Sequence, residues 1–591
     1  MKNRNEIPEQ YKWKLTHFKT EEDINNTLKL LDKSTQNASK YNGKFNDPEM
    51  FFDYFYSNIE DNIKIHQLYH YVSNMQSIDG NNQEIKKLIE RIEIAAAKNS
   101  KAYSYVEPQL NKLSTKYLKE LKSDPRAKDI ENEINRLIIS KKHRIDEKTS
   151  KVISDLNRSF NDTSSIFDIL TDLEMPFEDA IDSNKQSHKV SDSTYGSLIS
   201  STDRNLRKTA FSSLMNGYGK FNQTLTALYT KDVKCNIDFA KLYNYNTLLE
   251  ETLFDYIPKK VFENNIKVVE KNIPVLQDFI NTLKTTYNFN DFAYYDLFVD
   301  KKINGEISIE EGQKLMLNAL APLGSDYTQK VKQKLNDNSI DYLPNKGKTS
   351  GAYCSHCYNA KTLILMNWLN DFNSVSTLTH EMGHCINAEY FNEAQPYHKA
   401  DISIFAAEIA STVNEILLNQ YMQKTCSPEH KAYYIKEFLN DVRSTIFRQT
   451  LFTEFELYAY SSIENENPIT NEDLNDKYYE LNKKYYGTSC ILPDELKYEW
   501  SRIPHFYRPY YVFSYSTGLL TAISICQKIL DNENYYKSYI KFLKNGTNKK
   551  PVEMLKEIGI NLTTEKPFES AFEFIKKQLA EYKILCSQQK N

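Results

Sequence analysis

The sequence predicts a mostly α-helical protein that has at least two lobes and one small β region. The chain has 591 residues but only 15 Gly and 17 Pro. So few residues that break helices favour long helices over a turn-rich β architecture. Because single hydrophobic cores seldom grow beyond about 250 to 300 residues, a chain of this length is expected to form more than one lobe.

The N-terminal third of the chain is predicted to form helical hairpins. From Pro48 to about Ser200 the apolar residues recur three and four positions apart, as they do in residues 59–70, and this spacing marks one face of a helix. Ser201 and Asp203 then supply side chains that cap the start of a helix. We therefore place a boundary near residue 200 and predict an N-terminal helical domain, 1–200, and a catalytic domain, 201–591.

Between residues 290 and 370 the pattern changes to short β-type runs bounded by Gly, Pro and Asn. The runs predicted to form this small sheet are residues 295–300, 342–349, 351–355 and 362–368. Residues 351–355 are the predicted edge strand, whose free backbone groups can pair with an extended peptide. We therefore predict that Gly351, Ala352 and Tyr353 bind substrate.

The segment after this sheet carries an H-E-x-x-H motif that runs from His380 to His384. Residues four apart on an α-helix share one face, so both imidazoles can bind the same metal ion. Glu381 lies about 100° around the helix from His380. This position places Glu381 beside the metal, where it can act as a general base on a bound water. Because the motif follows a β-type run and a polar turn, we favour a metal site over a chance match.

A third metal ligand is predicted on a second helix that packs antiparallel to the first, because catalytic zinc takes three protein ligands and keeps one position open. Glu408 is the best candidate, since the small residues around it, among them Ala407 and Ser411, allow two helices to approach closely. Glu415 lies two turns further on and is predicted to accept a hydrogen bond from a metal-bound imidazole. An exposed salt bridge is the alternative role for Glu415. One Zn²⁺ per chain, held by His380, His384 and Glu408, is the resulting prediction.

These two segments resemble the zinc-binding segments of the oligoendopeptidase F branch of the thimet-oligopeptidase-like metallopeptidases. The resemblance extends over nearly the whole chain, through residues 6–13, 203–211, 350–353 and 503–507. It implies a two-lobed helical shell around a deep channel, with the zinc ion at its floor and the small sheet beside the zinc-binding helix. It also implies that the substrates are short, unstructured peptides.

A dense aromatic stretch, residues 500–518, is the predicted source of the groups that stabilise the oxyanion. In the thimet-like branch a histidine precedes a glycine-rich loop and a catalytic tyrosine, but here no glycine follows His505 before Gly518. Tyr511 and Tyr515 share one face of a helix that is predicted to begin near Pro509. We predict Tyr515 as the main donor, assisted by His505 and Tyr511, with Tyr511 or Tyr507 as the alternative main donor.

The predicted activity is hydrolysis of internal bonds in short oligopeptides by a zinc-activated water, with Glu381 as the base that later protonates the leaving amine. Two other classes stay open. One is a helical H-E-x-x-H exopeptidase of the carboxypeptidase type, and the other is a non-catalytic interaction protein stabilised by zinc. The second is less favoured because a structural zinc site does not need Glu381.

Composition excludes several partners. The net charge of −4, from 75 basic and 79 acidic residues, creates no broad field for nucleic acid or an anionic membrane. The N-terminus lacks a signal sequence and no apolar run approaches roughly 20 residues, so we predict a cytoplasmic protein. Its eight cysteines are scattered through a large chain and are predicted to be free thiols. A metal site at Cys354 and Cys357 is disfavoured because no second ligand pair lies at a suitable spacing. The oligomeric state is left open.

Overall fold

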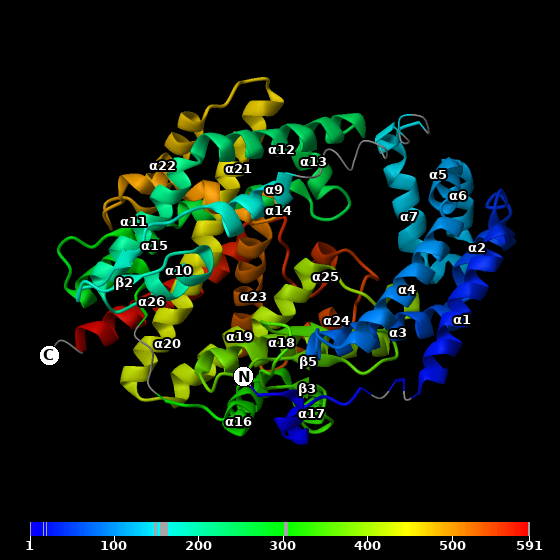
Figure 1. The fold of residues 1–591 in the computed structure, drawn as a ribbon, viewed down its shortest axis with the longest axis horizontal. Helices are drawn as coiled ribbons and strands as arrows, with labels where there is room; N and C mark the ends of the chain where they lie inside the picture. The colour runs from blue at the N-terminus through cyan, green and yellow to red at the C-terminus, as the bar shows by residue number, and fades with distance from the viewer. Residues whose placement is uncertain are drawn as a thin grey trace. The chain divides into compact units, whose positions relative to one another are not determined.

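The computed structural model of the chain describes residues 2–15, 17–18, 20–146, 149, 152–153, 163–300 and 305–588. These residues are mostly helical, as predicted (Figure 1), and they divide into two compact units. The first unit comprises Met1–Lys142, Gly305–Met422 and Ile525–Ile560, and the second comprises His143–Asn304, Gln423–Ser524 and Asn561–Asn591. Each unit is therefore built from three separate stretches, whereas the predicted boundary near residue 200, which stays a prediction, follows the order of the chain. Within the described residues, no helix has both the length and the apolar character needed to cross a membrane.

The first unit begins with helices that pack against one another in hairpins. Side chains at their first turns explain where they start. The Thr20 hydroxyl accepts the Asp23 N–H at the start of the first helix, and Asp47 caps the second, which has Pro48 in its first turn. The helices are α1 (Glu21–Asn37), α2 (Pro48–Tyr56), α3 (Ile59–Ile78), α4 (Gln83–Ala102), α5 (Val106–Lys112), α6 (Thr115–Ser123) and α7 (Glu131–Ile139).

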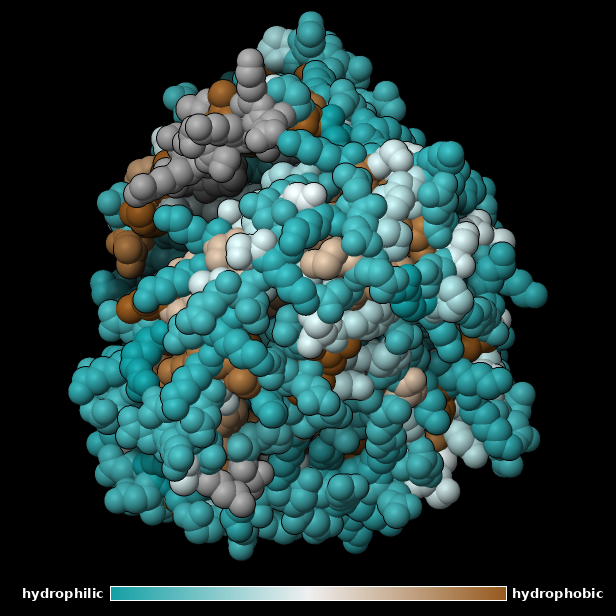
Figure 2. All heavy atoms as spheres, turned by 90° about the vertical axis from the view of Figure 1, so that its right-hand side faces the viewer, coloured by the Kyte–Doolittle hydropathy of each residue, from teal (hydrophilic) through white to brown (hydrophobic). Residues whose placement is uncertain are grey.

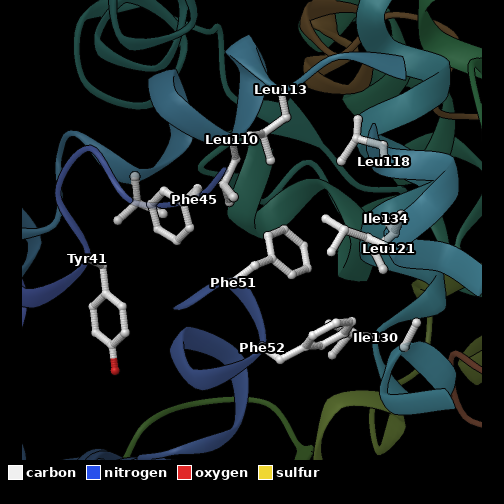
Figure 3. Close-up of a cluster of buried hydrophobic side chains, with 12 residues drawn as sticks. Tyr41, Phe45, Phe51, Phe52, Leu110, Leu113, Leu118, Leu121, Ile130 and Ile134 are labelled. Carbon is white, nitrogen blue, oxygen red and sulfur yellow. The ribbon is translucent and has the colours of Figure 1, made fainter. Parts of the chain in front are cut away.

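An aromatic and aliphatic core holds α2 against α5, α6 and α7 (Figure 3). Phe51 and Phe52 of α2 are fully or almost fully buried, with their rings 5.5 Å apart and nearly perpendicular. Leu118 and Ile134 close the cluster from α6 and α7 and expose no surface. The opposite sides of these helices meet solvent. Figure 2, which views the molecule from the side on which Figure 1 labels α1, α2, α5 and α6, shows a mainly hydrophilic surface. The 3–4 spacing of apolar residues in this part of the sequence is explained by this one-sided burial.

The rest of the first unit combines helices with a small mixed sheet. The helices are α16 (Ile309–Ala319), α17 (Ser325–Asn336), α18 (Phe372–Ala394), most of α19 (Ile404–Thr425), the last turns of α23 (Phe513–Asp531), α24 (Tyr536–Leu543) and α25 (Pro551–Glu557). The strands are β3 (Ile340–Asp341), β4 (Tyr353–Ser355) and β5 (Leu363–Leu365), in the order β3-β5-β4. β3 runs parallel to β5 and β4 runs antiparallel to it. The predicted edge strand is confirmed for Tyr353–Ser355.

Two predicted strands are wrong. The Tyr342 carbonyl still accepts the Trp368 N–H at 2.8 Å, but the chain then turns away instead of pairing through residue 349. The Lys348 ammonium folds back onto the buried Asp341 carboxylate at 2.7 Å, and Gly347 has a φ of +80°. In the second unit, residues 295–300 lie mainly in a 3₁₀ helix, Tyr294–Phe298. The Asp296 carboxylate accepts the Ala293 N–H at 3.0 Å and an Arg207 N–H at 2.7 Å. These bonds tie the backbone into a tight turn that is incompatible with an extended strand.

The second unit is almost entirely helical, and Asp203 caps one of its long helices, as predicted, by accepting the Leu206 N–H. Its helices are α9 (Thr163–Asp168), α10 (Asp192–Ile199), α11 (Arg204–Lys220), α12 (Asn222–Leu242), α13 (Leu248–Leu253), α14 (Lys259–Lys271), α15 (Ile273–Tyr287), α20 (Pro428–Asp441), α21 (Arg448–Glu464), α22 (Asn471–Tyr486), the first turns of α23, and α26 (Lys566–Gln588). β1 (Ala180–Ile181) and β2 (Ser187–His188) form an antiparallel pair. Buried aromatic rings, among them Tyr229, Phe455 and Trp500, fill its core.

Candidate active site

Helix α18 carries the H-E-x-x-H motif in the predicted setting, because strand β5 ends at Leu365 and the helix begins at Phe372. Asp371 starts the helix by accepting the Ser374 N–H at 2.8 Å. His380, Glu381 and His384 then lie in the middle of the helix, away from its ends. Their relative positions are therefore set by regular helical geometry.

Helices α18 and α19 approach each other so closely that their backbones nearly touch at Gly383. A Cβ atom at this glycine would lie 2.6 Å from the Ser411 Cα and 2.9 Å from the Ala410 carbonyl oxygen. The Asn414 amide also donates to the Thr379 carbonyl at 3.2 Å. Because later residues of α18 meet earlier residues of α19, the two helices are antiparallel, as predicted. Gly383 and Asn414 were not among the predicted site residues, although the glycine inside the motif was an available signal.

The close approach brings His380, His384 and Glu408 together, with one ligand atom from each within 4.8 Å of the others. The two Nε2 atoms are 3.1 Å apart. A Glu408 carboxylate oxygen lies 3.8 Å from the His380 Nε2, and the other lies 3.9 Å from the His384 Nε2. Two imidazole nitrogens and a carboxylate that converge in this way form a candidate metal site. Among the described residues, this is the one such group of His, Cys, Asp and Glu.

Glu415 orients the first histidine of this group. Its Oε1 atom lies 2.5 Å from the His380 Nδ1, which leaves the Nε2 of the same ring turned towards Glu408. Burial acts to lower the pKa of His380, but the hydrogen bond and the negative charge of Glu415 outweigh it and raise the pKa to about 9. For His384, burial and the neighbouring His380 lower the pKa to about 3, so this ring is neutral and able to bind a metal ion.

Glu381 is a buried carboxyl group beside this cluster, and only 7% of the residue is exposed. Burial, with a further contribution from the Glu408 charge, raises the pKa of Glu381 to about 7. Opposing effects come from the His380 charge and from a hydrogen bond with the Cys354 backbone of β4. A base with a pKa near neutral pH is well suited to accept a proton from water and release it again.

Strand β4 passes beside this carboxyl group, and none of the described strands pairs with its outer edge. Of the three residues predicted to bind substrate, Tyr353 lies in β4, whereas Gly351 and Ala352 precede the strand. Gly351 has a φ of +78°, and its carbonyl accepts the Asn367 amide at 2.8 Å. The structure therefore moves the available edge towards Tyr353–Ser355.

His505, Tyr511 and Tyr515 form a second polar cluster, which belongs to the second unit. Their rings are 5.3 to 6.2 Å apart, and the Tyr515 hydroxyl lies 3.4 Å from the His505 Nε2. The predicted helix start near Pro509 is wrong, because α23 begins at Phe513 and Tyr511 lies in the preceding turn. The reason is local: Tyr510 has a φ of +49°, a conformation that interrupts a right-handed helix.

Tyr507 lies apart from this cluster. Its ring packs 4.7 Å from that of Phe167 and 6.2 Å from that of Tyr229, and burial raises the pKa of its hydroxyl well above the usual range. Tyr507 is half-buried, and its ring contacts among the described residues are with these two rings and not with the cluster, so its role as the alternative donor stays a prediction. Cys354 and Cys357 are both free thiols, in line with the prediction made for all eight cysteines.

Replacing Gly383 with Ala is expected to destabilise the chain by about 1 to 3 kcal/mol, because the added methyl group meets backbone atoms that cannot rotate away. Thermal unfolding measures this change. Gly196→Ala in α10 is the matched control, since its Cβ would meet nothing within 4 Å. Equal melting temperatures for both variants would contradict the backbone contact between α18 and α19.

A helix pair that presents H-E-x-x-H and a further glutamate defines the class of metal-dependent peptide hydrolases. Comparison with known families specifies the class further. The model of peptidase family M3 matches residues 197–574, and the model described as Oligopeptidase F matches residues 109–177. The chain belongs to peptidase family M3 and is a metallo-endopeptidase.

The similarity to individual proteins extends over whole chains. The chain is 33% identical to an oligoendopeptidase F homolog of Borreliella burgdorferi over 99% of each sequence. It is 30% identical to the oligopeptidase PepF of Bacillus subtilis, over 99% of this chain and 88% of that protein. A crystal structure of a putative peptidase from Chlamydophila abortus matches with a TM-score of 0.92 at 30% identity, over 99% of this chain and all of the other. Oligoendopeptidase F from Enterococcus faecium matches with a TM-score of 0.72 at 28% identity, over 96% and 99% of the two chains.

Proposed function

We propose that the chain is a zinc-dependent oligoendopeptidase that cuts internal bonds of short, unstructured peptides. The observation that carries the proposal is the convergence of His380, His384 and Glu408 beside the buried carboxyl group of Glu381. The names of the relatives, which include several oligoendopeptidases F, support the same activity.

The spacing of the three side chains suits zinc. Donor atoms that share a tetrahedral ion at the usual distances of about 2.0 to 2.2 Å stand about 3.3 to 3.6 Å apart. The three separations measured here, 3.1, 3.8 and 3.9 Å, bracket that range. When bound, a zinc ion supplies a Lewis acid that polarises a water molecule and a peptide carbonyl group. We therefore propose one Zn²⁺ per chain.

The chain's own groups move the protons in the proposed reaction. Glu381 accepts a proton from the attacking water and later donates it to the amine of the leaving peptide. Glu415 holds His380 in one orientation through the Nδ1 contact, so that Nε2 is available as a ligand. The free edge of β4 is proposed to hold the backbone of an extended substrate through main-chain hydrogen bonds, which do not depend on the side-chain sequence of the peptide.

The Tyr515 hydroxyl is the proposed main donor to the negative oxygen that develops on the carbonyl, with His505 and Tyr511 assisting. The mutual contacts of the three side chains support a shared task. The metal site and this aromatic cluster belong to different compact units. The proposed role of the cluster therefore depends on the chemistry of its side chains and not on a distance to the metal site. We also propose a cytoplasmic location, because eight free thiols suit a reducing compartment.

Tyr515→Phe is expected to lower kcat about a hundredfold with little change in KM, because the lost hydrogen bond forms only as charge develops. Tyr511→Phe should have a smaller effect. Tyr507→Phe is the matched control, since its half-buried ring contacts Phe167 and Tyr229 instead of this cluster. Steady-state kinetics of the three zinc-loaded variants ranks the three tyrosines by the loss of kcat that each substitution causes. If none loses even about tenfold in kcat, the oxyanion donor lies elsewhere.

Mass spectrometry of a peptide ladder tests the function as a whole. Peptides from a few to a few tens of residues, acetylated and amidated at their ends, are incubated with the zinc-loaded chain alongside casein. We expect internal cuts in the short members and loss of cleavage with a chelator. An exopeptidase of the carboxypeptidase type would leave the blocked peptides intact, and equally rapid cleavage of casein would contradict the preference for short substrates.

A further inference from the structure

The backbone between His505 and Tyr511 makes an unusual turn for its sequence. Tyr510 lies in the left-handed region, with a φ of +49°, although this region favours glycine and small polar residues. The turn is short, because the Arg508 N–H bonds the His505 carbonyl at 3.0 Å and the Tyr511 N–H bonds the Arg508 carbonyl at 3.2 Å. A strained turn persists only where its surroundings hold it in place.

Two side chains of α21 hold this turn from one face of that helix. The Glu456 Oε1 accepts the Tyr510 N–H at 2.9 Å. The Tyr460 hydroxyl donates to the Phe506 carbonyl at 3.2 Å, and its ring meets that of Tyr510 edge-on at 4.8 Å. Glu456 and Tyr460 are four residues apart and therefore lie one above the other on the helix. Together they bind the backbone on both sides of Arg508 and Pro509.

Burying the Glu456 side chain in a hydrophobic core is energetically unfavourable. Glu456 exposes no surface, and its Oε2 makes no hydrogen bond with the described residues. Burial raises the pKa of its carboxyl group well above the usual range. Burying a carboxyl group in this way costs stability, and an apolar side chain would pack there at lower cost. The bond to the Tyr510 N–H is the specific interaction that such a replacement would remove.

The turn in question carries the aromatic cluster. His505 comes directly before the Phe506–Tyr510 turn and Tyr511 comes directly after it. The Arg508 guanidinium lies 3.8 Å from the centre of the Tyr511 ring. Tyr515 follows one turn later in α23 and contacts both His505 and Tyr511. A displacement of the turn would therefore move His505 and Tyr511 relative to Tyr515.

We infer that Glu456 and Tyr460 are positioning residues, which clamp the Phe506–Tyr510 turn so that His505, Tyr511 and Tyr515 present their polar atoms together. This inference rests on the proposed role of the three side chains in stabilising the oxyanion. Neither Glu456 nor Tyr460 is required to touch substrate. Small errors in the placement of such donors lower the rate of the chemical step, because the donors act on charge that develops only in the transition state.

The test compares four variants of the full, zinc-loaded chain. Glu456→Met keeps the length of the side chain but removes the acceptor, whereas Glu456→Gln restores an acceptor oxygen without a charge. Tyr460→Phe removes only the hydroxyl group. Tyr229→Phe is the matched control, because this buried hydroxyl makes no hydrogen bond with the described residues. Each variant is measured for kcat and KM on a short peptide, for melting temperature, and for hydrogen exchange of the peptide covering residues 505–515.

We expect Glu456→Met to lower kcat by about tenfold or more and to speed exchange in residues 505–515, with KM unchanged. Glu456→Gln should stay within about threefold of the parent, and Tyr460→Phe should fall between them. Unchanged exchange in Glu456→Met and Tyr460→Phe would overturn the clamp, and faster exchange with unchanged kcat would overturn its catalytic role. If Glu456→Met does not fold, the comparison of Tyr460→Phe with Tyr229→Phe decides the question. A zinc-loaded parent chain that cuts no peptide overturns the proposed function itself, and the exchange data then still show whether the clamp exists.

Discussion

Glu381→Gln is expected to lower kcat at least about a thousandfold, while the chain keeps its metal ion and still binds peptide. The amide has nearly the same shape as the carboxyl group but cannot accept the proton of the attacking water. Because Glu381 is not one of the converging ligand atoms, the metal site should stay intact. Initial rates, metal content and peptide affinity measured on the same sample separate these effects.

The matched control is Glu393→Gln, which changes a half-exposed glutamate on the same helix that pairs with Lys330 at the surface. Exposed pairs of this kind contribute little to stability, so this variant should keep the parent activity. If Glu381→Gln remains as active as this control, another group is the base. If Glu381→Gln loses its metal ion as well as its activity, Glu381 is needed for metal binding. The assignment of Glu381 as a base that does not bind the metal is then wrong.

Glu408→Ala is expected to weaken metal affinity by more than a hundredfold and to abolish activity at ordinary zinc concentrations. It removes one of the three converging side chains, and two imidazoles alone do not make a catalytic zinc site. Equilibrium dialysis against zinc, followed by metal analysis, measures the affinity directly. The readout does not depend on turnover, so it tests the site even if the substrate is wrongly identified.

Glu415→Gln provides a graded comparison for this second experiment. The amide can still accept a hydrogen bond from the His380 Nδ1 but carries no charge, and partners of metal-bound histidines typically change affinity by about 10- to 100-fold. We therefore expect an intermediate loss. Parent-like affinity for Glu408→Ala would show that this glutamate is not a ligand, and a larger loss for Glu415→Gln than for Glu408→Ala would reverse the two assignments.

Elements that depend on local spacing were predictable from the sequence. The N-terminal helices follow from apolar residues three and four apart, and the starts at Thr20 and Asp203 follow from capping side chains. The strand prediction failed at Tyr294–Phe298, where the sequence has β-forming residues. There the Asp296 carboxylate binds Arg204 and Arg207 from a distant helix, and these bonds outweigh the local preference.

Part of the candidate site was likewise predictable from local spacing, and part of it was not. His380, Glu381 and His384 lie within two turns of one helix, so their relative geometry follows from the helical repeat alone. Glu408 was predicted from the small residues around it and Glu415 from its place two turns further on, and both are also local signals. The reason for the close approach, the contact of Gly383 with Ser411, needed both helices in place.

By itself, the sequence determined the helical class, the H-E-x-x-H helix and its partner helix, because backbone hydrogen bonds and side-chain spacing within one segment specify a helix. The β-type pattern of the edge strand was also visible in the sequence, but the hydrogen bonds of β4 are made to β5, a separate segment. Only the tertiary structure decided the rest. The division into units of three stretches each, the exclusion of Tyr507 from the aromatic cluster, and the clamp of Glu456 on the Tyr510 turn all depend on residues far apart in sequence. Such contacts leave no periodic trace in the chain, because their energy comes from burial and from single hydrogen bonds between segments that folding brings together.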